Sequence, residues 1–168
     1  MITALVSTVG GPEALATTLS ALVPAVADGL IGDAVVLARS PDPQAERIAE
    51  AVGATFVVAP AGEDAWRAGA AASRRDWVLC LEAGDIPSEG WIRALDRFVA
   101  LAPADRRFGR LPRRHATLAA RMRSLLAVMR SREVRPGDLI HRSLLQASAP
   151  RRRPRTIAAF VERDPAFG

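Results

Sequence analysis

Two carboxylates stand three positions apart in the segment Glu82-Ala83-Gly84-Asp85, directly after the apolar run at residues 77–81. Divalent cations such as Mg²⁺ and Mn²⁺ take carboxylate oxygens from short turns, together with the phosphates of a substrate. This spacing predicts Glu82 and Asp85 as ligands of such a cation. A second interpretation stays open, because Asp85 and Ser88 are also residue types that cap the start of a helix.

Other side chains could act as acids or bases. Asp138 is a candidate general base, although an aspartate after Pro136-Gly137 is also typical of a turn. His141 could exchange a proton near neutral pH, or pack at the end of a strand. Cys80 is the only cysteine of the chain, which excludes an intramolecular disulfide and a thiolate zinc cluster.

The basic residues are all arginine, and they are concentrated in the second half of the chain. Residues 1–104 hold 7 arginines against 13 acidic residues, whereas residues 105–168 hold 16 against 5. This asymmetry predicts an anionic partner for the second half. Arg110, Arg113 and Arg114 could clamp a diphosphate in place of a metal ion, because guanidinium groups pair with phosphate in a bidentate manner.

A predicted helix over residues 117–132 is basic and amphipathic. It could lie on an anionic membrane surface, near a lipid-linked acceptor. The alternative is that its apolar stripe covers the sheet while its charges stay solvated. Nucleic acid is the less favoured partner, since the second half has few aromatic side chains for stacking on bases.

Short β-branched runs alternate with helical stretches in the first part of the chain. Continuous apolar strands separated by helices are typical of an α/β fold with a buried, mostly parallel sheet, and 168 residues make a single domain. The predicted strands are residues 4–8, 34–38, 55–58 and 77–81. The predicted helices are 13–26, a segment between the cap at 40–43 and Gly53, 64–73, and a segment starting at 88–91.

Ligands of such sheets bind beyond the carboxyl ends of the strands. The expected site is therefore formed by the loops 7–11, 39–42, 59–63 and 82–87. The second half follows a different pattern. It is predicted to contain a polar, arginine-rich connection at 103–114, a turn at 135–138, a short strand at 139–141 and a last strand at 156–161.

No apolar run approaches the roughly 20 residues that span a bilayer. The first residues also lack the positive charge of a secretory signal. These features predict a cytoplasmic protein, peripheral to the inner membrane if the basic helix binds lipid. The alanine- and arginine-rich composition without lysine is typical of a GC-rich bacterial genome.

The order of these elements, together with two segments, resembles the family-2 glycosyltransferases of the GT-A fold. Residues 68–87 read AGAAASRRDWVLCLEAGDIP. They resemble that family's passage N-x-G-x-x-x-A-x-G-(D/E)-(W/Y)-(I/L)-(L/V)-(F/x)-L-D-A-D-D-x-P. The opening Val6-Ser7-Thr8-Val9-Gly10 is similar to the family's nucleotide-binding start. The resemblance covers residues 1–102.

The resemblance implies a GT-A-like, Rossmann-like α/β domain that transfers a sugar from a nucleoside-diphosphate sugar to an acceptor, with inversion. Residues 1–102 would form the nucleotide-sugar-binding region, and residues 103–168 an arginine-rich acceptor-side region of the same domain. The expected site residues are Thr8, Val9, Arg39, Arg113 and Arg114 for the nucleotide, Glu82 and Asp85 for Mg²⁺ or Mn²⁺, and Asp138 as the base.

Departures from the family pattern favour an alternative function. Glu82 and Gly84 stand where the family has aspartates, Ala38 replaces a strand-two aspartate, and Arg67 replaces an asparagine. No carboxylate follows Asp138 until position 162, so the family's late glutamate-aspartate pair is not evident. The alternative is a non-catalytic binding or assembly module that keeps the fold without the metal motif and the base.

Overall fold

The computed structural model describes residues 1–103, 107–113, 133–147 and 153–167. Within these residues the centre is a seven-stranded sheet with the order β3-β2-β1-β4-β7-β6-β8. The first half of the chain supplies four parallel strands: β1 (Ile2–Ser7), β2 (Ile31–Ala38), β3 (Thr55–Val58) and β4 (Trp77–Glu82). The second half adds β6 (Phe108–Arg110), β7 (Asp138–His141) and β8 (Arg155–Thr156).

Strand β7 reverses the direction of the sheet. It pairs antiparallel with β4 on one side and with β6 on the other, and β6 pairs in parallel with β8. The sheet is therefore mostly parallel in the first half of the chain and mixed in the second. Because β7 lies between β4 and β6, the two halves of the chain share one sheet.

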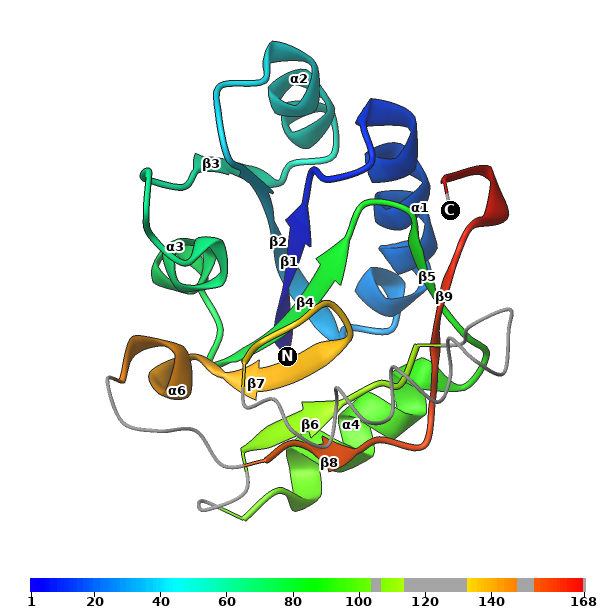
Figure 1. Cartoon of the computed structure of the whole chain (residues 1–168). Helices are drawn as coiled ribbons and strands as arrows, with labels where there is room; N and C mark the ends of the chain where they lie inside the picture. Colours follow the sequence, from blue (N-terminus) through cyan, green and yellow to red (C-terminus); the bar gives the residue numbers. More distant parts are fainter. Residues whose placement is uncertain (104–106, 114–132, 148–152, 168) are drawn as a thin grey trace, which may run out of the picture.

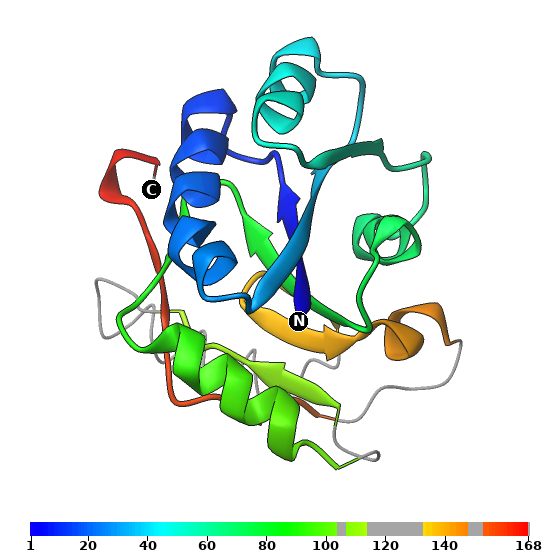
Figure 2. The same ribbon diagram turned by 180° about the vertical axis from the view of Figure 1, so that it is seen from behind.

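Helices cover both faces of this sheet (Figures 1 and 2). On one face α1 (Pro12–Ala27) and α4 (Trp91–Leu101) bury their apolar residues against the strands, with α2 (Pro43–Ala51) beside α1. On the other face, α3 (Ala65–Ala72) and α6 (Arg142–Gln146) pack on the sheet through Ala70 and Leu145. The result is a layer of strands between two layers of helices.

The helices begin at start signals in the sequence. Pro12 occupies the first turn of α1, where no amide donor is needed. Asp42 caps α2 by accepting hydrogen bonds from the amides of Gln44 and Ala45, at 3.1 and 3.0 Å. Asp64 caps α3 in the same way. These elements agree with the predicted helices.

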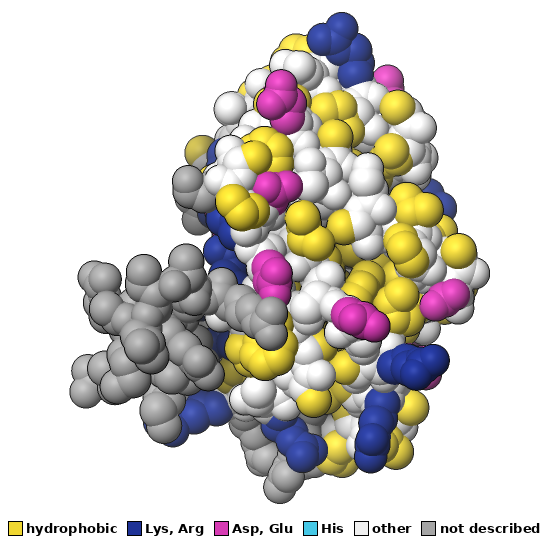
Figure 3. All heavy atoms as spheres, turned by 90° about the vertical axis from the view of Figure 1, so that its right-hand side faces the viewer, with side chains coloured by type: hydrophobic (Ala, Val, Ile, Leu, Met, Phe, Trp, Pro, Cys, Tyr) yellow, Lys and Arg dark blue, Asp and Glu magenta, His cyan; other side chains and the backbone are white. Residues whose placement is uncertain are grey.

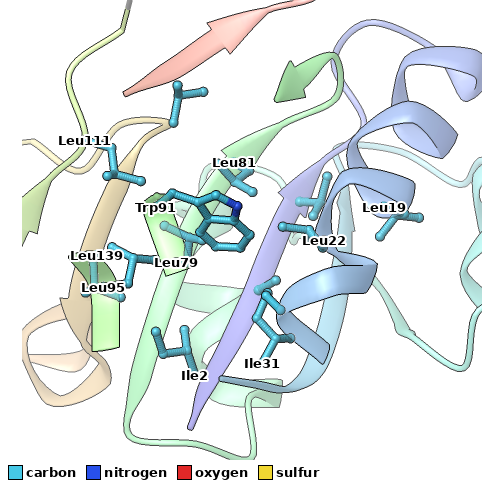
Figure 4. Packing of buried hydrophobic residues seen from close by; sticks show 14 of the residues in the cluster. Ile2, Leu19, Leu22, Ile31, Leu79, Leu81, Trp91, Leu95, Leu111 and Leu139 are labelled. Carbon is cyan, nitrogen blue, oxygen red and sulfur yellow. The ribbon is translucent and has the colours of Figure 1, made fainter. Parts of the chain in front are cut away.

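The core on the α1 and α4 face is formed by large aliphatic side chains around one indole. Figure 4 shows Trp91 of α4 between Leu79 and Leu81 of β4 and the α1 side chain of Leu22. Trp91 is 5% exposed, and Leu79 and Leu81 are fully buried. Removal of an indole from such a core costs about 3–5 kcal/mol. This packing holds the carboxyl end of β4 in place.

A two-stranded sheet joins the acidic segment to the end of the chain. Strand β5 (Asp85–Pro87) pairs antiparallel with β9 (Val161–Arg163), and Asp85 stands opposite Arg163. A short 3-10 helix, η1 (Pro165–Phe167), follows β9. The sequence did not indicate this pairing, because the two strands have only three residues each and are far apart in the chain.

The helix-cap interpretation of Asp85 and Ser88 is wrong. Helix α4 starts after Gly90, which has a positive φ of 81° and provides no side-chain cap. The Ser88 hydroxyl accepts instead from the amide of Phe160, at 3.0 Å. Ser88 therefore bonds to the C-terminal segment, and Asp85 accepts from the Glu82 amide.

Two further expectations for the second half need correction. The predicted connection at 103–114 contains strand β6. The predicted strand at 156–161 is two strands, β8 and β9, because the chain leaves the large sheet after Thr156 to reach β5. The predicted helix at 117–132 and the candidate Arg114 lie outside the described residues.

The exposed surface mixes hydrophobic and charged side chains. Figure 3 shows the side of the molecule that lies to the right in Figure 1, where hydrophobic side chains occur in small groups between charged and polar ones. In the part of the chain that the structure describes, no helix is both long and apolar enough to cross a membrane.

Candidate functional site

The loops after the parallel strands meet at one edge of the sheet, as predicted. Ser7 at the end of β1 is in register with Leu37 of β2 and with Glu82 of β4. The Thr8 amide donates to the Leu37 carbonyl at 2.9 Å, and the Ala83 amide donates to the Ser7 carbonyl at 2.8 Å. The start of the β1 loop therefore lies directly beside the acidic segment.

The acidic turn, residues 82–85, closes on itself. Gly84 has a φ of 93°, a backbone conformation that glycine adopts without steric cost. Its amide donates to Thr18 Oγ1 of α1 at 2.9 Å, and the Glu82 amide donates to Asp85 Oδ2 at 2.9 Å. Asp85 is fully buried, whereas the Glu82 side chain is 20% exposed. Helix α1 and the turn's own hydrogen bonds thus fix the backbone of the turn and the Asp85 carboxylate.

Two arginines from the second half of the chain neutralise these carboxylates. Nη2 of Arg113 lies 2.6 and 2.7 Å from the two oxygens of Asp85, and 3.0 Å from Glu82 Oε2. Nη1 of Arg163 donates to the same Glu82 oxygen at 2.9 Å, and its Nε donates to the carbonyl of Phe167. The arginine–carboxylate cluster, defined as Glu82, Asp85, Arg113 and Arg163, carries two charges of each sign.

Burial governs the protonation of this cluster. Burial raises the pKa of Asp85 above its ordinary value, while the Arg113 charge and the hydrogen bond from the Glu82 amide oppose the rise. For Arg113, burial lowers the pKa, but the charge of Asp85 and the bonds to both carboxylates outweigh it, so the pKa is raised overall. Arg113 is therefore a permanent cation held between two acids.

The cluster leaves little room for a divalent cation among its own oxygens. Both oxygens of Asp85 and one of Glu82 accept from guanidinium groups. In the ranges that the structure describes, no group of three or more His, Cys, Asp or Glu side chains could hold a metal. A cation would have to displace two arginines to reach the carboxylates. As folded, Glu82 and Asp85 do not fit a metal site.

Asp138, the predicted base, lies in a buried ion pair. Its side chain is fully buried, and Arg110 Nε and Nη2 contact its two oxygens at 2.5 and 2.7 Å. The Arg135 amide donates to the second oxygen at 2.8 Å. Burial raises the pKa of Asp138, and the hydrogen bonds and charge of Arg110 oppose this rise. These contacts are typical of a structural ion pair, and the role of Asp138 as a base stays a prediction.

The remaining candidates are distributed along the same edge. Thr8 is half-buried and Val9 is 54% exposed, next to the arginine–carboxylate cluster. Arg39 follows β2 and donates to the Glu63 carbonyl at 3.1 Å, so it lies toward the β3 side. Arg110, considered as a phosphate clamp, is 5% exposed and bound to Asp138.

Arg163 is the site residue that the sequence did not reveal. It lies 81 positions after Glu82, in a strand whose pairing partner is only three residues long. Arg163 Nη2 also lies near the β1 loop, since a Cβ on Gly10 would be 3.5 Å from it. No local motif could have indicated this contact, because only the β5–β9 pairing brings the two residues together.

No protein-family model and no curated protein matches the chain. Solved structures do match. The glucosyl-3-phosphoglycerate synthase of Mycobacterium tuberculosis, in complex with Mn²⁺, uridine-diphosphate-glucose and phosphoglyceric acid, is similar with a TM-score of 0.64 at 20% identity. The same protein in complex with Mg²⁺ and uridine-diphosphate gives 0.63 at 20% identity. Each match covers 86% of this chain and 57% of the other.

A third match is a structure named only as a mycobacterial protein, with a TM-score of 0.60 and 19% identity, covering 86% of this chain and 54% of the other. The chain thus spans little more than half the length of these proteins. At this level of identity the likeness concerns the fold. It confirms the expected GT-A-like α/β architecture and its similarity in structure to a nucleotide-sugar-dependent glycosyltransferase.

Proposed function

We propose that this chain is a glycosyltransferase-like domain that binds a nucleoside-diphosphate sugar at the carboxyl edge of β1 and β4, with arginine charge in place of a divalent cation. The observation that carries the proposal is the contact of Arg113 and Arg163 with both predicted metal ligands, Glu82 and Asp85. The similar fold of a synthase solved with uridine-diphosphate-glucose supports the choice of ligand class.

The cluster suits a diphosphate for electrostatic reasons. Two bare carboxylates would repel phosphate oxygens, whereas the neutralised cluster does not. Each guanidinium has five N–H donors. Arg113 bonds to the carboxylates through Nη2, and its Nε is buried, so that atom does not reach a ligand. The Arg113 and Arg163 side chains are 26% and 27% exposed, so their exposed N–H groups can meet phosphate oxygens, beside the loop that carries Thr8 and Val9.

A specific observation favours a second function, a binding module with the same ligand and no sugar transfer. Sugar transfer to a hydroxyl requires a group that accepts the proton. Asp138, the predicted base, has both oxygens bound to Arg110 and is fully buried. In the binding module, Asp138 stabilises the fold and the bound sugar nucleotide is held without reaction.

Calorimetric titration with UDP-glucose, in Mn²⁺ and in EDTA, tests the first proposal. We expect the same affinity in both buffers. Arg163→Gln should weaken binding by about tenfold or more, because one charge-assisted hydrogen bond is lost. Arg47→Gln, a matched change on α2, should leave the affinity unchanged. Binding that requires Mn²⁺ and disappears in Glu82→Gln would overturn the arginine site, and the absence of binding to UDP-, GDP- or other sugar nucleotides would overturn the ligand class.

An activity assay on the same protein distinguishes the transferase from the binding module. Incubation with UDP-glucose, followed by measurement of released UDP with and without candidate acceptors, detects transfer or hydrolysis. Release of UDP that depends on the protein and increases with an acceptor supports a transferase. The destabilised variant Asp138→Asn is compared only under conditions in which circular dichroism shows that it is folded. Tight binding without release over many hours supports the binding module.

A further inference from the structure

A hollow lies at the amino edge of the sheet, opposite the arginine–carboxylate cluster. Its volume is about 470 Å³. Strand β4 begins there, and the antiparallel strand β7 ends there, so Trp77 is in register with His141. Its wall includes Arg74, Arg75, Asp76, Trp77, Arg107 and His141.

The wall of this hollow, called the amino-edge pocket here, has an excess of positive charge. Three arginines stand against one aspartate, Asp76. That aspartate already has a partner outside the wall, since Arg142 Nε lies 3.2 Å from its Oδ1. Asp76 therefore balances at most one of the three wall arginines, and the pocket attracts anions.

The positive charge of Arg75 is only partly neutralised by neighbouring carboxylates. The nearest carboxylate, Asp33, lies 3.9 Å from Arg75 Nε, beyond hydrogen-bond distance. The oxygens of Asp33 accept instead from Thr3 Oγ1 at 2.7 Å and from the Arg74 amide at 3.1 Å. Arg75 Nε is buried without a hydrogen-bond partner among the described residues, while the side chain as a whole is 39% exposed. The side chain lies over Gly32, where an added Cβ would be 2.7 Å from Nε.

Arg107 is oriented by a histidine. Its Nη1 lies 3.3 Å from His141 Nε2. A guanidinium is only a donor, so Nε2 accepts from Arg107, while Nδ1 lies 2.7 Å from Ser143 Oγ and accepts from the Ser143 amide at 3.4 Å. Burial, followed by the charge of Arg107, lowers the pKa of His141, and Asp76 opposes this. The ring thus holds Arg107 without adding a charge.

We propose that the amino-edge pocket binds a small phosphate monoester. A phosphate monoester carries about −1.5 to −2 charges at pH 7, which matches the excess of arginines in the wall. Arginine pairs with phosphate oxygens through two parallel hydrogen bonds. The half-buried Trp77 and the neighbouring apolar wall fit the organic part, and the volume lies in the range of small-molecule sites.

The shape of the site favours a small molecule over nucleic acid. A nucleic-acid site needs a long basic track and aromatic rings that are free to stack. Trp77 makes edge-to-face contacts with Phe98 and His141, at centroid distances of 5.9 and 5.7 Å. Its ring is held in the wall and is not presented as a stacking platform.

The test follows the His141 ring by NMR while phenyl phosphate, and separately inorganic phosphate, is added at constant ionic strength. We expect saturable shifts with phenyl phosphate, and displacement of it by inorganic phosphate at higher concentration. Arg74→Gln should weaken binding by about tenfold. Arg74 is exposed and only its backbone amide makes a hydrogen bond that involves this residue among the described groups, so the fold should tolerate the change.

The matched control is Arg47→Gln, which removes one exposed arginine from α2. Equal weakening of phenyl phosphate binding in both variants would show general charge attraction and overturn the proposal. Shifts that do not saturate would also overturn it. The same holds if a short RNA moves the His141 signal at lower concentration than phenyl phosphate. UDP-glucose should leave His141 unchanged, because the proposed nucleotide site lies at the other edge. The two proposals can therefore fail separately.

Discussion

At the scale of single residues, buried arginine–aspartate pairs determine the chemistry of the sheet edge. Asp85 and Asp138 are both fully buried, and each has one arginine on both of its oxygens. The two arginines come from one short segment, at positions 110 and 113. A buried carboxylate without such a partner would be strongly destabilising. The segment therefore stabilises the fold at the place where the sequence predicted chemistry.

Asp138→Asn is expected to destabilise the protein by about 3–5 kcal/mol, because it leaves the Arg110 guanidinium buried without its counter-charge. Urea unfolding monitored by circular dichroism measures the change. Asp96→Asn, an exposed position on α4, serves as the control and should change stability by no more than about 0.5 kcal/mol. An unchanged unfolding midpoint in Asp138→Asn would contradict the structural role of this pair.

The pKa of His141 is expected to lie below its ordinary value of 6.5. The folded chain then binds fewer protons at this site than the unfolded chain, so stability falls as the pH drops below about 6.5. Arg107→Gln should raise the pKa toward the ordinary value, because it removes a nearby positive charge. NMR titration of the ring signal measures both values. A pKa at or above 6.5 in the wild-type protein would contradict the prediction.

At the scale of elements, small residues let helix α3 approach the sheet closely. A Cβ at Gly69 would lie 2.8 and 2.9 Å from the two terminal carbons of Leu37 in β2. Leu37 is 2% exposed and has little space to move. The alanine-rich sequence of α3 predicted close packing, and the structure identifies the position where the approach is tightest.

Gly69→Ala is expected to destabilise the protein by about 1–3 kcal/mol, since the added methyl group overpacks the interface with β2. This outcome opposes intrinsic propensity, because alanine favours a helix over glycine by about 1 kcal/mol. The cost should largely disappear when the same change is made in a Leu37→Ala background. Thermal and urea unfolding of the four variants form the cycle. A stabilising effect of Gly69→Ala alone would show that the interface is looser than the structure indicates.

At the scale of the whole molecule, the acidic and the basic half of the sequence form one unit. Strand β7 of the second half pairs with β4 of the first, and β9 pairs with β5 (Figure 1). Leu111 and Leu139 belong to the same core cluster as Leu79 and Trp91. The opposite charges of the two halves meet in the arginine–carboxylate cluster.

A fragment of residues 1–102 is therefore expected not to fold alone. It would expose the edge of β4, leave Asp85 without Arg113, and lose the side chains that cover Leu79. The amide NMR spectrum of the fragment should show little dispersion, whereas the full chain in the same buffer should show a well-dispersed spectrum. A cooperative unfolding transition of the fragment would contradict the single-unit architecture.

The sequence alone determined the first half of the fold. Apolar runs such as residues 77–81 and caps such as Asp42 and Asp64 are local signals, because a strand's burial and a helix start depend on neighbouring residues. Parallel strands then place their carboxyl ends at one edge, which was sufficient to predict that Thr8, Glu82 and Asp85 lie close together. Strand β6 was not predicted, because three residues among arginines are too short to show the alternation of apolar and polar side chains that marks a strand.

Only the tertiary structure decided the state of those side chains. Whether Glu82 and Asp85 face a cation or a guanidinium depends on Arg113 and Arg163, which lie 31 and 81 positions after Glu82. The partner of Asp138 is 28 positions earlier. Spacing along the chain carries no information about such pairs, because the strand order of the sheet, rather than local geometry, brings the charges together. The charge balance of a buried site is a property of the complete fold.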